Sequence, residues 1–288
     1  MNYVYKKISV TTDALKNLIC LKNTPIDTMR LRPVGYKQND KCPKVEEYWG
    51  TIPFGHTVNR RDSHFWIYCK VKTPKKTTDH QKVYYTLRTG REGRWDGTNP
   101  QALLYINGKA VQGLDVNHTD VELEFDKEYD LYLYFYTGME EANILIEPSI
   151  MVVDTKIEHL YYDMRVPFES LSCLDENDDD AVTTAKYLEM ACNLIDLRQP
   201  YSKEFYNSID EAIGFLKTEY YENPKVCGKG NAEVSCIGHT HIDVAWKWTI
   251  AQTEEKAQRS FATVLKLMDD GYDEYKFMSS QPQLYDYV

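Results

Sequence analysis

The sequence lacks any stretch long and apolar enough to span a bilayer, which requires about 20 consecutive apolar residues. Its first residues, Met-Asn-Tyr-Val-Tyr-Lys-Lys, have no apolar core of the kind found in a signal peptide. Internal repeats and low-complexity tracts are also absent. These absences exclude a transmembrane protein and a repeat architecture, and they favour a globular chain.

The cysteines are scattered and show no pairing pattern. There are seven cysteines, an odd number, scattered along the chain. Cys69, Cys192 and Cys236 lie inside apolar segments that we expect to form strands or helices. We therefore expect reduced thiols without a disulfide framework, and a cytoplasmic location.

Basic residues are fewer than acidic residues. Lysine and arginine total 34 against 44 aspartates and glutamates, so the net charge is −10. This charge argues against nucleic acid and anionic membranes as partners, although ordinary solubility is its simplest explanation. The acidic run 175–180 could bind a cation, but a solvated linker whose last acids cap the next helix fits it better. Residues 228–230, Gly-Lys-Gly, lack the spacing of a phosphate-binding loop and indicate a break between elements.

Up to about Val153 the pattern is mostly β. Residues 65–71, 83–87 and 131–136 are rich in aromatic and β-branched side chains. Asn107-Gly108, between apolar runs 102–106 and 109–111, predicts a type I′ hairpin, whose two central residues need positive φ. These short strands predict a β-sandwich, with a short helix near Thr12-Asp13 at its start.

Several aromatic and polar residues fall in the loops expected for this sandwich. They are found in Trp95-Asp96-Gly97, Tyr105-Ile106-Asn107-Gly108 and 113–118. Such groups can stack on a sugar and bind its hydroxyls, but turn residues that hold the sandwich together are the simpler interpretation.

Two helices follow the acidic run. Apolar residues recur at three- and four-residue steps from Ala181 to Ile195, and Gln199-Pro200 ends this first helix. A second face, from Tyr206 to Tyr220, predicts another helix before Asn223-Pro224.

The most informative stretch is 234–246. Val234-Ser235-Cys236-Ile237 predicts a short buried strand, and a helix is expected from about Thr253 to Asp270. Side chains alternate in an extended chain, so His239, His241 and Asp243 would share one side. Imidazole nitrogens and carboxylate oxygens are ligands for zinc or a similar divalent ion. Alternatively, both histidines hydrogen-bond the backbone of a buried loop.

Two motifs also carry a family resemblance. Gly-His-Thr-His-Ile-Asp-Val-Ala-Trp-Lys-Trp (238–248) and Ser-Ser-Gln-Pro-Gln-Leu-Tyr (279–285) resemble two blocks of the glycoside hydrolase family 38 α-mannosidases, with helix 259–268 between them. The residues of the first block, His-Ile-Asp-Val-Ala-Trp, resemble those found in the bacterial and cytosolic branch of the family more than those of the Golgi and lysosomal branch. Members of that branch carry an N-terminal sandwich with a related stretch, Asn-Gly followed by Gly-x-Asp-x-x-His.

The resemblance implies a retaining hydrolase of terminal α-mannose residues in oligosaccharides. It implies one Zn²⁺ ion, or another divalent cation, with His241 and Asp243 among four protein ligands. His239 would support the ligands without touching the ion. Trp246 would form a platform beside the mannose, although a core tryptophan is the alternative. The nucleophile, the acid/base and the fourth ligand are expected beyond Val288, so we expect the 288 residues alone to be inactive.

We therefore expect a multidomain protein, β then α/β. A jelly-roll, galactose-binding-like sandwich (1–174) would precede a helical linker (175–230) and the first βα units of a (β/α)7 barrel (231–288). The expected partner is an α-mannoside oligosaccharide, and the family branch often forms homodimers. Two alternatives remain. One is a metal-dependent amidohydrolase, because a His-x-His at the end of the first barrel strand also serves hydrolysis of amides. The other is a non-catalytic sugar-binding or assembly module.

Overall fold

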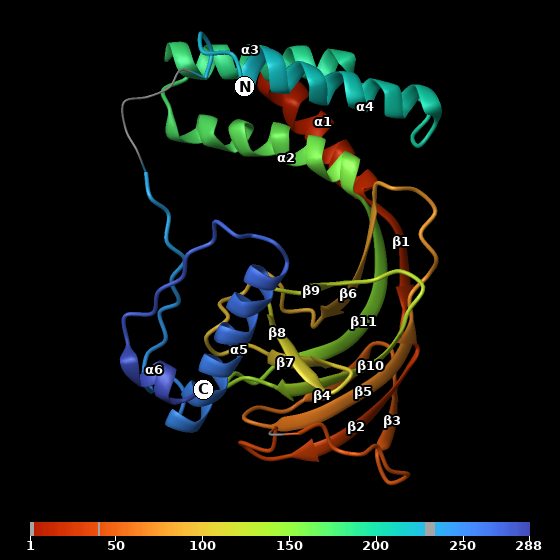
Figure 1. Ribbon diagram of the computed structural model, residues 1–288, viewed down its shortest axis with the longest axis vertical. Helices are drawn as coiled ribbons and strands as arrows, with labels where there is room; N and C mark the ends of the chain where they lie inside the picture. The colour runs from red at the N-terminus through yellow and green to blue at the C-terminus, as the bar shows by residue number, and fades with distance from the viewer. Residues whose placement is uncertain (1–2, 40, 228–233) are drawn as a thin grey trace. The chain divides into compact units, whose positions relative to one another are not determined.

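The computed structural model describes residues 3–39, 41–227 and 234–288 (Figure 1). The chain divides into two compact units. The helical unit is formed by the described residues of Met1–Lys22, Thr77–Lys82 and Val152–Val234. The sheet unit is formed by those of Asn23–Lys76, Val83–Met151 and Ser235–Val288. No helix among the described residues combines the length and apolar character needed to cross a membrane.

Four α-helices make up most of the helical unit: α1 (Tyr3–Ile19), α2 (Thr155–Ser170), α3 (Asp179–Leu194) and α4 (Lys203–Phe215). A 3₁₀ turn (Leu171–Cys173) follows α2, and a π turn (Leu216–Tyr221) follows α4. Their apolar faces form one core, with fully buried side chains such as Ile8, Leu160, Leu188 and Ile209. Hydrophobic burial of these faces against one another therefore holds the unit together.

The helix starts follow capping rules. Asp178, the last acid before α3, accepts a hydrogen bond from the Asp180 N–H, as the acidic run predicted. Asp154 caps α2 by accepting from the N–H groups of Lys156 and Ile157, both at 3.0 Å. The Tyr206 hydroxyl donates to the other oxygen of Asp154 at 2.7 Å. This buried carboxylate is therefore fully used in holding α2 and α4.

The sheet unit is built on two sheets. One has the order β3-β2-β5-β10-β7-β8, and the other β1-β11-β6-β9 with β4 on β11. The strands of the first are β2 (Thr28–Val34), β3 (Gly50–Pro53), β5 (His64–Lys72), β7 (Gln101–Ile106), β8 (Lys109–Asp115) and β10 (Glu128–Tyr136). Those of the second are β1 (Cys20–Pro25), β4 (His56–Asn59), β6 (Gln81–Arg88), β9 (Asp120–Leu123) and β11 (Asn143–Asp154).

Strand β10 lies at the centre of the first sheet and pairs antiparallel with β5 and β7. The β7–β8 hairpin turns at Asn107 and Gly108, with φ of 50° and 85°, which confirms the predicted turn. Ile67, Leu104 and Leu133 are buried on one face of the sheet. Because side chains alternate along strands, Trp66 and Tyr134 lie on the other face, which is also buried.

Helix α5 (Ile250–Asp269) covers this aromatic face, and α6 (Pro282–Asp286) follows it. Ala262 of α5 packs on a cluster of buried residues, namely Trp49, Trp66, Leu103, Tyr105 and Tyr134. The α5 residues are therefore tied to the sheets, although almost 100 residues separate them from the last strand.

Two features of the observed division differ from the sequence-based one. Residues 3–19 and 155–170, expected within the sandwich region 1–174, form α1 and α2 of the helical unit, because their apolar faces complete its core. Residues 235–288 form part of the sheet unit. The predicted break at 228–230 lies outside the described residues.

The prediction of a short buried strand at 234–237 is wrong. These residues have no strand hydrogen bonds, and Val234 is 80% exposed. Only Gly238 pairs, as an isolated parallel bridge with Phe277. Its N–H donates to the Lys276 carbonyl at 2.7 Å, and its carbonyl accepts from Met278 N at 2.9 Å. A strand requires continuous pairing, which one bridge does not supply.

Candidate functional site

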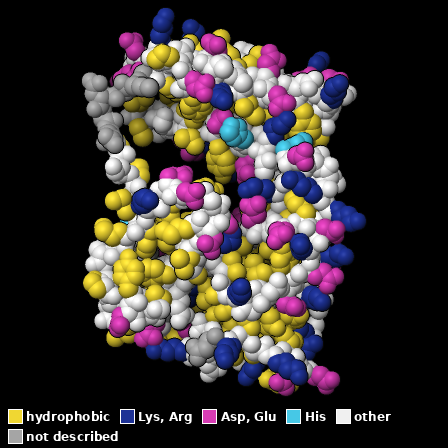
Figure 2. Space-filling model, in the orientation of Figure 1, with side chains coloured by type: hydrophobic (Ala, Val, Ile, Leu, Met, Phe, Trp, Pro, Cys, Tyr) yellow, Lys and Arg dark blue, Asp and Glu magenta, His cyan; other side chains and the backbone are white. Residues whose placement is uncertain are grey.

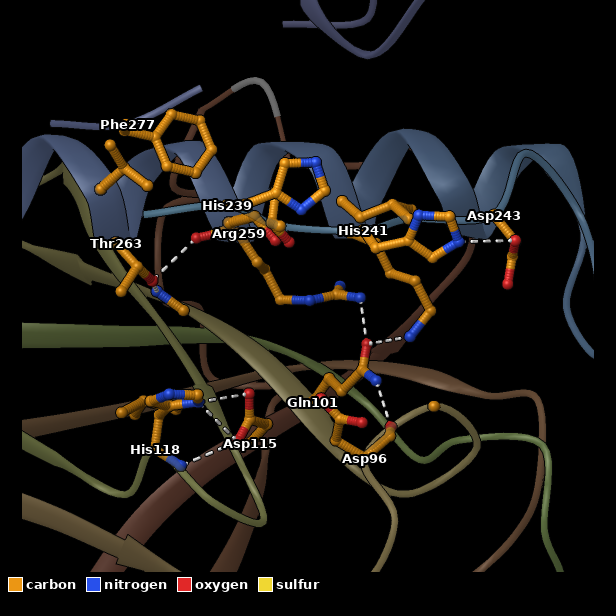
Figure 3. Close-up of a pocket in the computed structure, with 18 of the residues that line it drawn as sticks. Asp96, Gln101, Asp115, His118, His239, His241, Asp243, Arg259, Thr263 and Phe277 are labelled. Carbon is orange, nitrogen blue, oxygen red and sulfur yellow. Dashed lines mark hydrogen bonds and ion pairs between the residues drawn. The ribbon is translucent and has the colours of Figure 1, made fainter. Parts of the chain in front are cut away.

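A pocket of about 470 Å³ lies within the sheet unit, between the segment that precedes α5 and the loops of the first sheet (Figure 3). His239, His241 and Asp243 line one wall, next to α5. Asp96, Asp115 and His118 come from the sheet side. The volume falls in the range of about 300–1,000 Å³ that is typical of small-molecule sites.

The first turn of α5 holds residues 238–248, the histidine motif, in place. Thr249 caps the helix, and its hydroxyl accepts from Gln252 N at 3.2 Å. The buried Thr253 hydroxyl accepts from Ala245 N at 3.2 Å and from the Trp248 indole N–H at 3.1 Å. Ala245 has φ of 64°, an unusual value for a residue with a Cβ, and it turns the chain sharply just before Trp246.

The predicted metal ligands lie side by side. His241 Nε2 and Asp243 Oδ1 are 3.1 Å apart, with side chains 68% and 45% exposed. His239 Nε2 instead lies 3.4 Å from Ser280 Oγ, in the second sequence motif. The structure therefore brings all three residues to one pocket but pairs only two of them.

His241 and Asp243 would supply two of the ligands of a metal site. Within residues 3–39, 41–227 and 234–288, no three His, Cys, Asp or Glu side chains gather closely enough to hold an ion. An imidazole and a carboxylate at 3.1 Å suit zinc by type. A complete structural or catalytic zinc site needs at least one further protein donor.

Trp246, the predicted sugar platform, is 59% exposed and lines the pocket. Its ring lies 5.3 Å from Trp95 and 5.9 Å from Trp248, centroid to centroid. Lys247 Nζ lies 5.0 Å from the Trp246 ring centre and 5.4 Å from that of Trp95. Three indoles from two distant segments thus form one aromatic surface.

The pocket floor is cationic. Gln101 Oε1 accepts hydrogen bonds from Lys256 Nζ, at 3.0 Å, and from Arg259 Nη2. Gln101 Nε2 in turn donates to the Asp96 carbonyl at 2.5 Å. Burial, together with the nearby Arg259 charge, lowers the pKa of Lys256 to about 7. This lysine therefore changes charge near neutral pH.

A paired carboxylate and imidazole lie on the opposite wall. Asp115 Oδ1 accepts from the N–H groups of Asn117 and His118 at 2.7 and 2.8 Å, and Oδ2 lies 2.9 Å from His118 Nδ1. Burial opposes ionisation of Asp115, but the hydrogen bonds from His118 and the backbone outweigh it and lower the Asp115 pKa. The same hydrogen bond raises the pKa of His118 despite its partial burial.

Sequence reasoning favoured turn roles for Trp95, Asp96, Asp115 and His118. The structure shows that these residues also line the pocket. The Gly-x-Asp-x-x-His pattern at 113–118 was the available signal, but its position opposite His239 and His241 depends on α5 docking to β8. Lys256 and Gln101 were missed, because neither stands out from other polar residues in the sequence.

Comparison with known proteins agrees with the family resemblance. Residues 231–288 match the N-terminal domain of glycosyl hydrolases family 38. Alpha-mannosidase G from Dictyostelium discoideum is 25% identical over 310 residues, covering 94% of this chain and 25% of its own length. Alpha-mannosidase from Saccharomyces cerevisiae is 36% identical over 90 residues, 28% of this chain and 8% of its own length.

The chain thus spans a quarter or less of these curated relatives. Among solved structures, a beta-glucuronidase from Faecalibacterium prausnitzii aligns with a TM-score of 0.34 and 13% identity, over 48% of this chain and 32% of that one. A TM-score this low does not establish a shared fold. The sequence matches, by contrast, confirm the predicted resemblance to the N-terminal portion of a family 38 α-mannosidase.

Proposed function

We propose that this chain is the N-terminal portion of a retaining, zinc-dependent α-mannosidase that removes terminal, non-reducing α-D-mannose residues from oligosaccharides. One observation carries the proposal: His241 and Asp243 lie 3.1 Å apart in a pocket with Trp246, within the stretch that matches family 38. Both relatives reported above are named α-mannosidases, which favours this reaction over amide hydrolysis or a purely sugar-binding role.

We propose that His241 and Asp243 would be two of the residues that hold the zinc ion. When bound, the ion would supply a positive charge that orients sugar hydroxyls. The support is chemical, because imidazole and carboxylate donors suit zinc and these two side chains are exposed to the pocket. His239 would keep the motif in place through Ser280 of the second motif.

The remaining steps are assigned by the needs of the reaction. Retaining glycoside hydrolysis uses one carboxylate as nucleophile and a second carboxyl group as acid and then base. We propose that both lie outside these 288 residues. Within the chain, Trp246 would stack on the terminal mannose and fix its orientation, while the neighbouring Trp248 excludes water from that side.

We further propose that residues 231–288 begin a (β/α)7 barrel and that the two sheets are of jelly-roll type. The parallel bridge between Gly238 and Phe277, with α5 between them, has the form of a βα unit. Ile237, Leu265 and Met278 are exposed, and further barrel elements would cover them. Figure 2 shows such apolar side chains on the surface around α5 and α6.

A cytoplasmic location and a homodimeric assembly also remain proposals. All seven cysteines are free thiols, which suits a reducing compartment. The negative net charge supports a neutral sugar substrate over nucleic acid or an anionic membrane. Size-exclusion chromatography with light scattering would test the dimer.

The deciding experiment uses the full-length protein that contains this chain. We expect it to hydrolyse an aryl α-mannoside and to lose activity with a chelator. His241→Ala and Asp243→Ala should each lower kcat/KM and zinc affinity by about 100-fold or more. His159→Ala is the matched control, because His159 is also exposed and paired with an aspartate, in the helical unit.

Two results would count against the proposal. One is an enzyme that binds zinc equally well with and without both substitutions. The other is a full-length protein that cleaves no α-mannoside. Assay of the 288 residues alone tests a separate point, since turnover by them would show that the carboxyl groups do not lie outside.

A further inference from the structure

Trp95 belongs to a loop of the sheet unit, yet it lies in the pocket beside Trp246. The two rings meet edge to face, with an interplanar angle of 77°, and Trp95 keeps 46% of its surface exposed. An exposed indole beside a binding platform is unusual unless something covers it, because its apolar surface is costly in water. Trp95 thus adds a second exposed indole to the aromatic surface that Trp246 presents to the pocket.

Gly97 fixes the position of the Trp95 ring. A Cβ added at Gly97 would lie 2.3 Å from Cζ2 of Trp95, far inside van der Waals contact. The indole is therefore folded closely over the backbone of its own loop. This loop also includes Asp96, whose carbonyl is held by Gln101. The ring is preorganised by neighbours that come from the sheet unit.

His118 provides a polar group that lines the same pocket. Its Nδ1 is committed to Asp115 at 2.9 Å, and no hydrogen bond engages its Nε2 among the described residues. Asp115 is in turn held by two backbone N–H groups. The pair therefore presents an oriented imidazole Nε2 to the pocket, which accepts a hydrogen bond from a sugar hydroxyl when the ring is neutral and donates one when it is protonated. A fixed polar nitrogen and exposed indoles in one pocket suit a sugar ring with its hydroxyls.

We propose that Trp95 and the Asp115–His118 pair bind the leaving-group sugar, which is the residue to which the terminal mannose is linked before cleavage. This inference rests on the proposed function. An enzyme that removes terminal residues has all remaining sugars on one side of the cleaved bond. If the terminal mannose lies at Trp246 and His241, the adjoining wall of the pocket is available for the next sugar.

The test compares two substrates of the full-length enzyme. α-Mannosyl fluoride has a leaving group that needs no sugar site, whereas α-linked mannobioses place a second mannose there. For Trp95→Ala and His118→Gln we expect kcat/KM to fall about tenfold for the mannobiose that the wild type cleaves best, with little change for the fluoride. Asp115→Asn should act like His118→Gln, because it releases the imidazole.

Two matched controls separate contact from general damage. Tyr272→Ala removes another exposed aromatic side chain of the sheet unit that lies outside the pocket. His159→Gln alters a histidine that is 62% exposed, as His118 is, and paired with Asp163. Gly97→Ala displaces the Trp95 ring without removing it and should reproduce the loss on mannobiose.

Equal losses on the fluoride and the disaccharide, or no loss on either, would overturn the inference. Turnover of the fluoride by the wild type checks the proposed function separately, because that reaction does not involve the second sugar. If Trp95→Ala fails to fold, His118→Gln and Asp115→Asn decide the question, since both side chains lie at the surface of the pocket.

Discussion

Lys256 shows at the scale of one residue how burial changes chemistry in this pocket. Its ammonium group lies 4.5 Å from the centre of the Trp248 ring and donates to Gln101. Burial and the nearby Arg259 lower its pKa from 10.5 to about 7. At pH values between about 7 and 10.5, Lys256 is therefore protonated in the unfolded chain and mostly neutral in the folded chain.

This difference makes stability depend on pH. Because the unfolded state binds more protons, the free energy of unfolding should rise as pH increases from about 7 towards 10.5, by up to about 1.4 kcal/mol per pH unit. Lys256→Met should remove that slope relative to the wild type. Urea unfolding at pH 7, 8 and 9 measures it, with Lys70→Met as a surface control. Identical slopes for wild type and Lys256→Met would refute the shift.

Helix α5 is held to the first sheet by a buried polar network. Glu255 Oε2 lies 2.8 Å from His64 Nε2, with both side chains only 2% exposed. Glu255 Oε1 accepts from the Tyr134 hydroxyl at 2.9 Å and from Lys37 N at 3.2 Å. Since α5 also carries Thr253, this network fixes the histidine motif relative to the sheet.

Glu255→Gln should destabilise the sheet unit by about 1–3 kcal/mol, because a buried partner loses its charge-assisted hydrogen bond. Burial opposes ionisation of Glu255, but His64 outweighs it and lowers the pKa below 4.5. The stabilisation should therefore be complete above pH 4.5 and disappear as pH falls through the folded-state pKa. Urea unfolding against pH tests this, with the surface change Glu124→Gln, at a side chain that is 78% exposed, as control.

Close contact between β8 and α5 depends on Gly113. A Cβ at this position would lie 3.0 Å from both Cβ and the carbonyl oxygen of Arg259. Gly113→Ala should therefore push α5 away and cost about 1–3 kcal/mol. Gly214→Ala in α4 is the opposite case, because nothing lies within 4 Å of the added Cβ, and it should stabilise by about 0.5–1 kcal/mol.

Thermal unfolding of the two glycine variants provides the comparison. If Gly113→Ala is as stable as the wild type, the β8–α5 contact is looser than the structure indicates. If His241 and Asp243 bind zinc as proposed, the zinc affinity of this variant should also fall, because Thr253 of α5 hydrogen-bonds Ala245 and Trp248 next to them.

The whole molecule contains two units, each with a core of its own. Leu160 is fully buried in the helical core and Leu104 in the first sheet. Leu160→Ala and Leu104→Ala should each cost about 2–5 kcal/mol. Hydrogen exchange should show faster exchange in the helices for the first variant and in the strands for the second. Equal acceleration throughout the chain in both variants would show that the units unfold together.

At the same scale, some elements were predictable and others were not. The hairpin at Asn107-Gly108 and helices α3, α4 and α5 follow local rules of turn chemistry, capping and periodicity. Helix α2 was missed, although Asp154 as a cap and Ile157, Leu160 and Met164 at helical spacing give a local signal. The strand expected at 234–237 did not form, because strands depend on partners that periodicity cannot reveal.

By itself, the sequence determined the chemical character of this protein: the two motifs, the donor types at His239, His241 and Asp243, and the family resemblance. These depend on residue identity and short spacing, which need no knowledge of packing. Only the tertiary structure decided that Trp95, Asp115 and His118 share a pocket with those donors. The physical reason is the docking of α5 on β8 and β10, a burial of polar and aromatic groups between segments more than 100 residues apart.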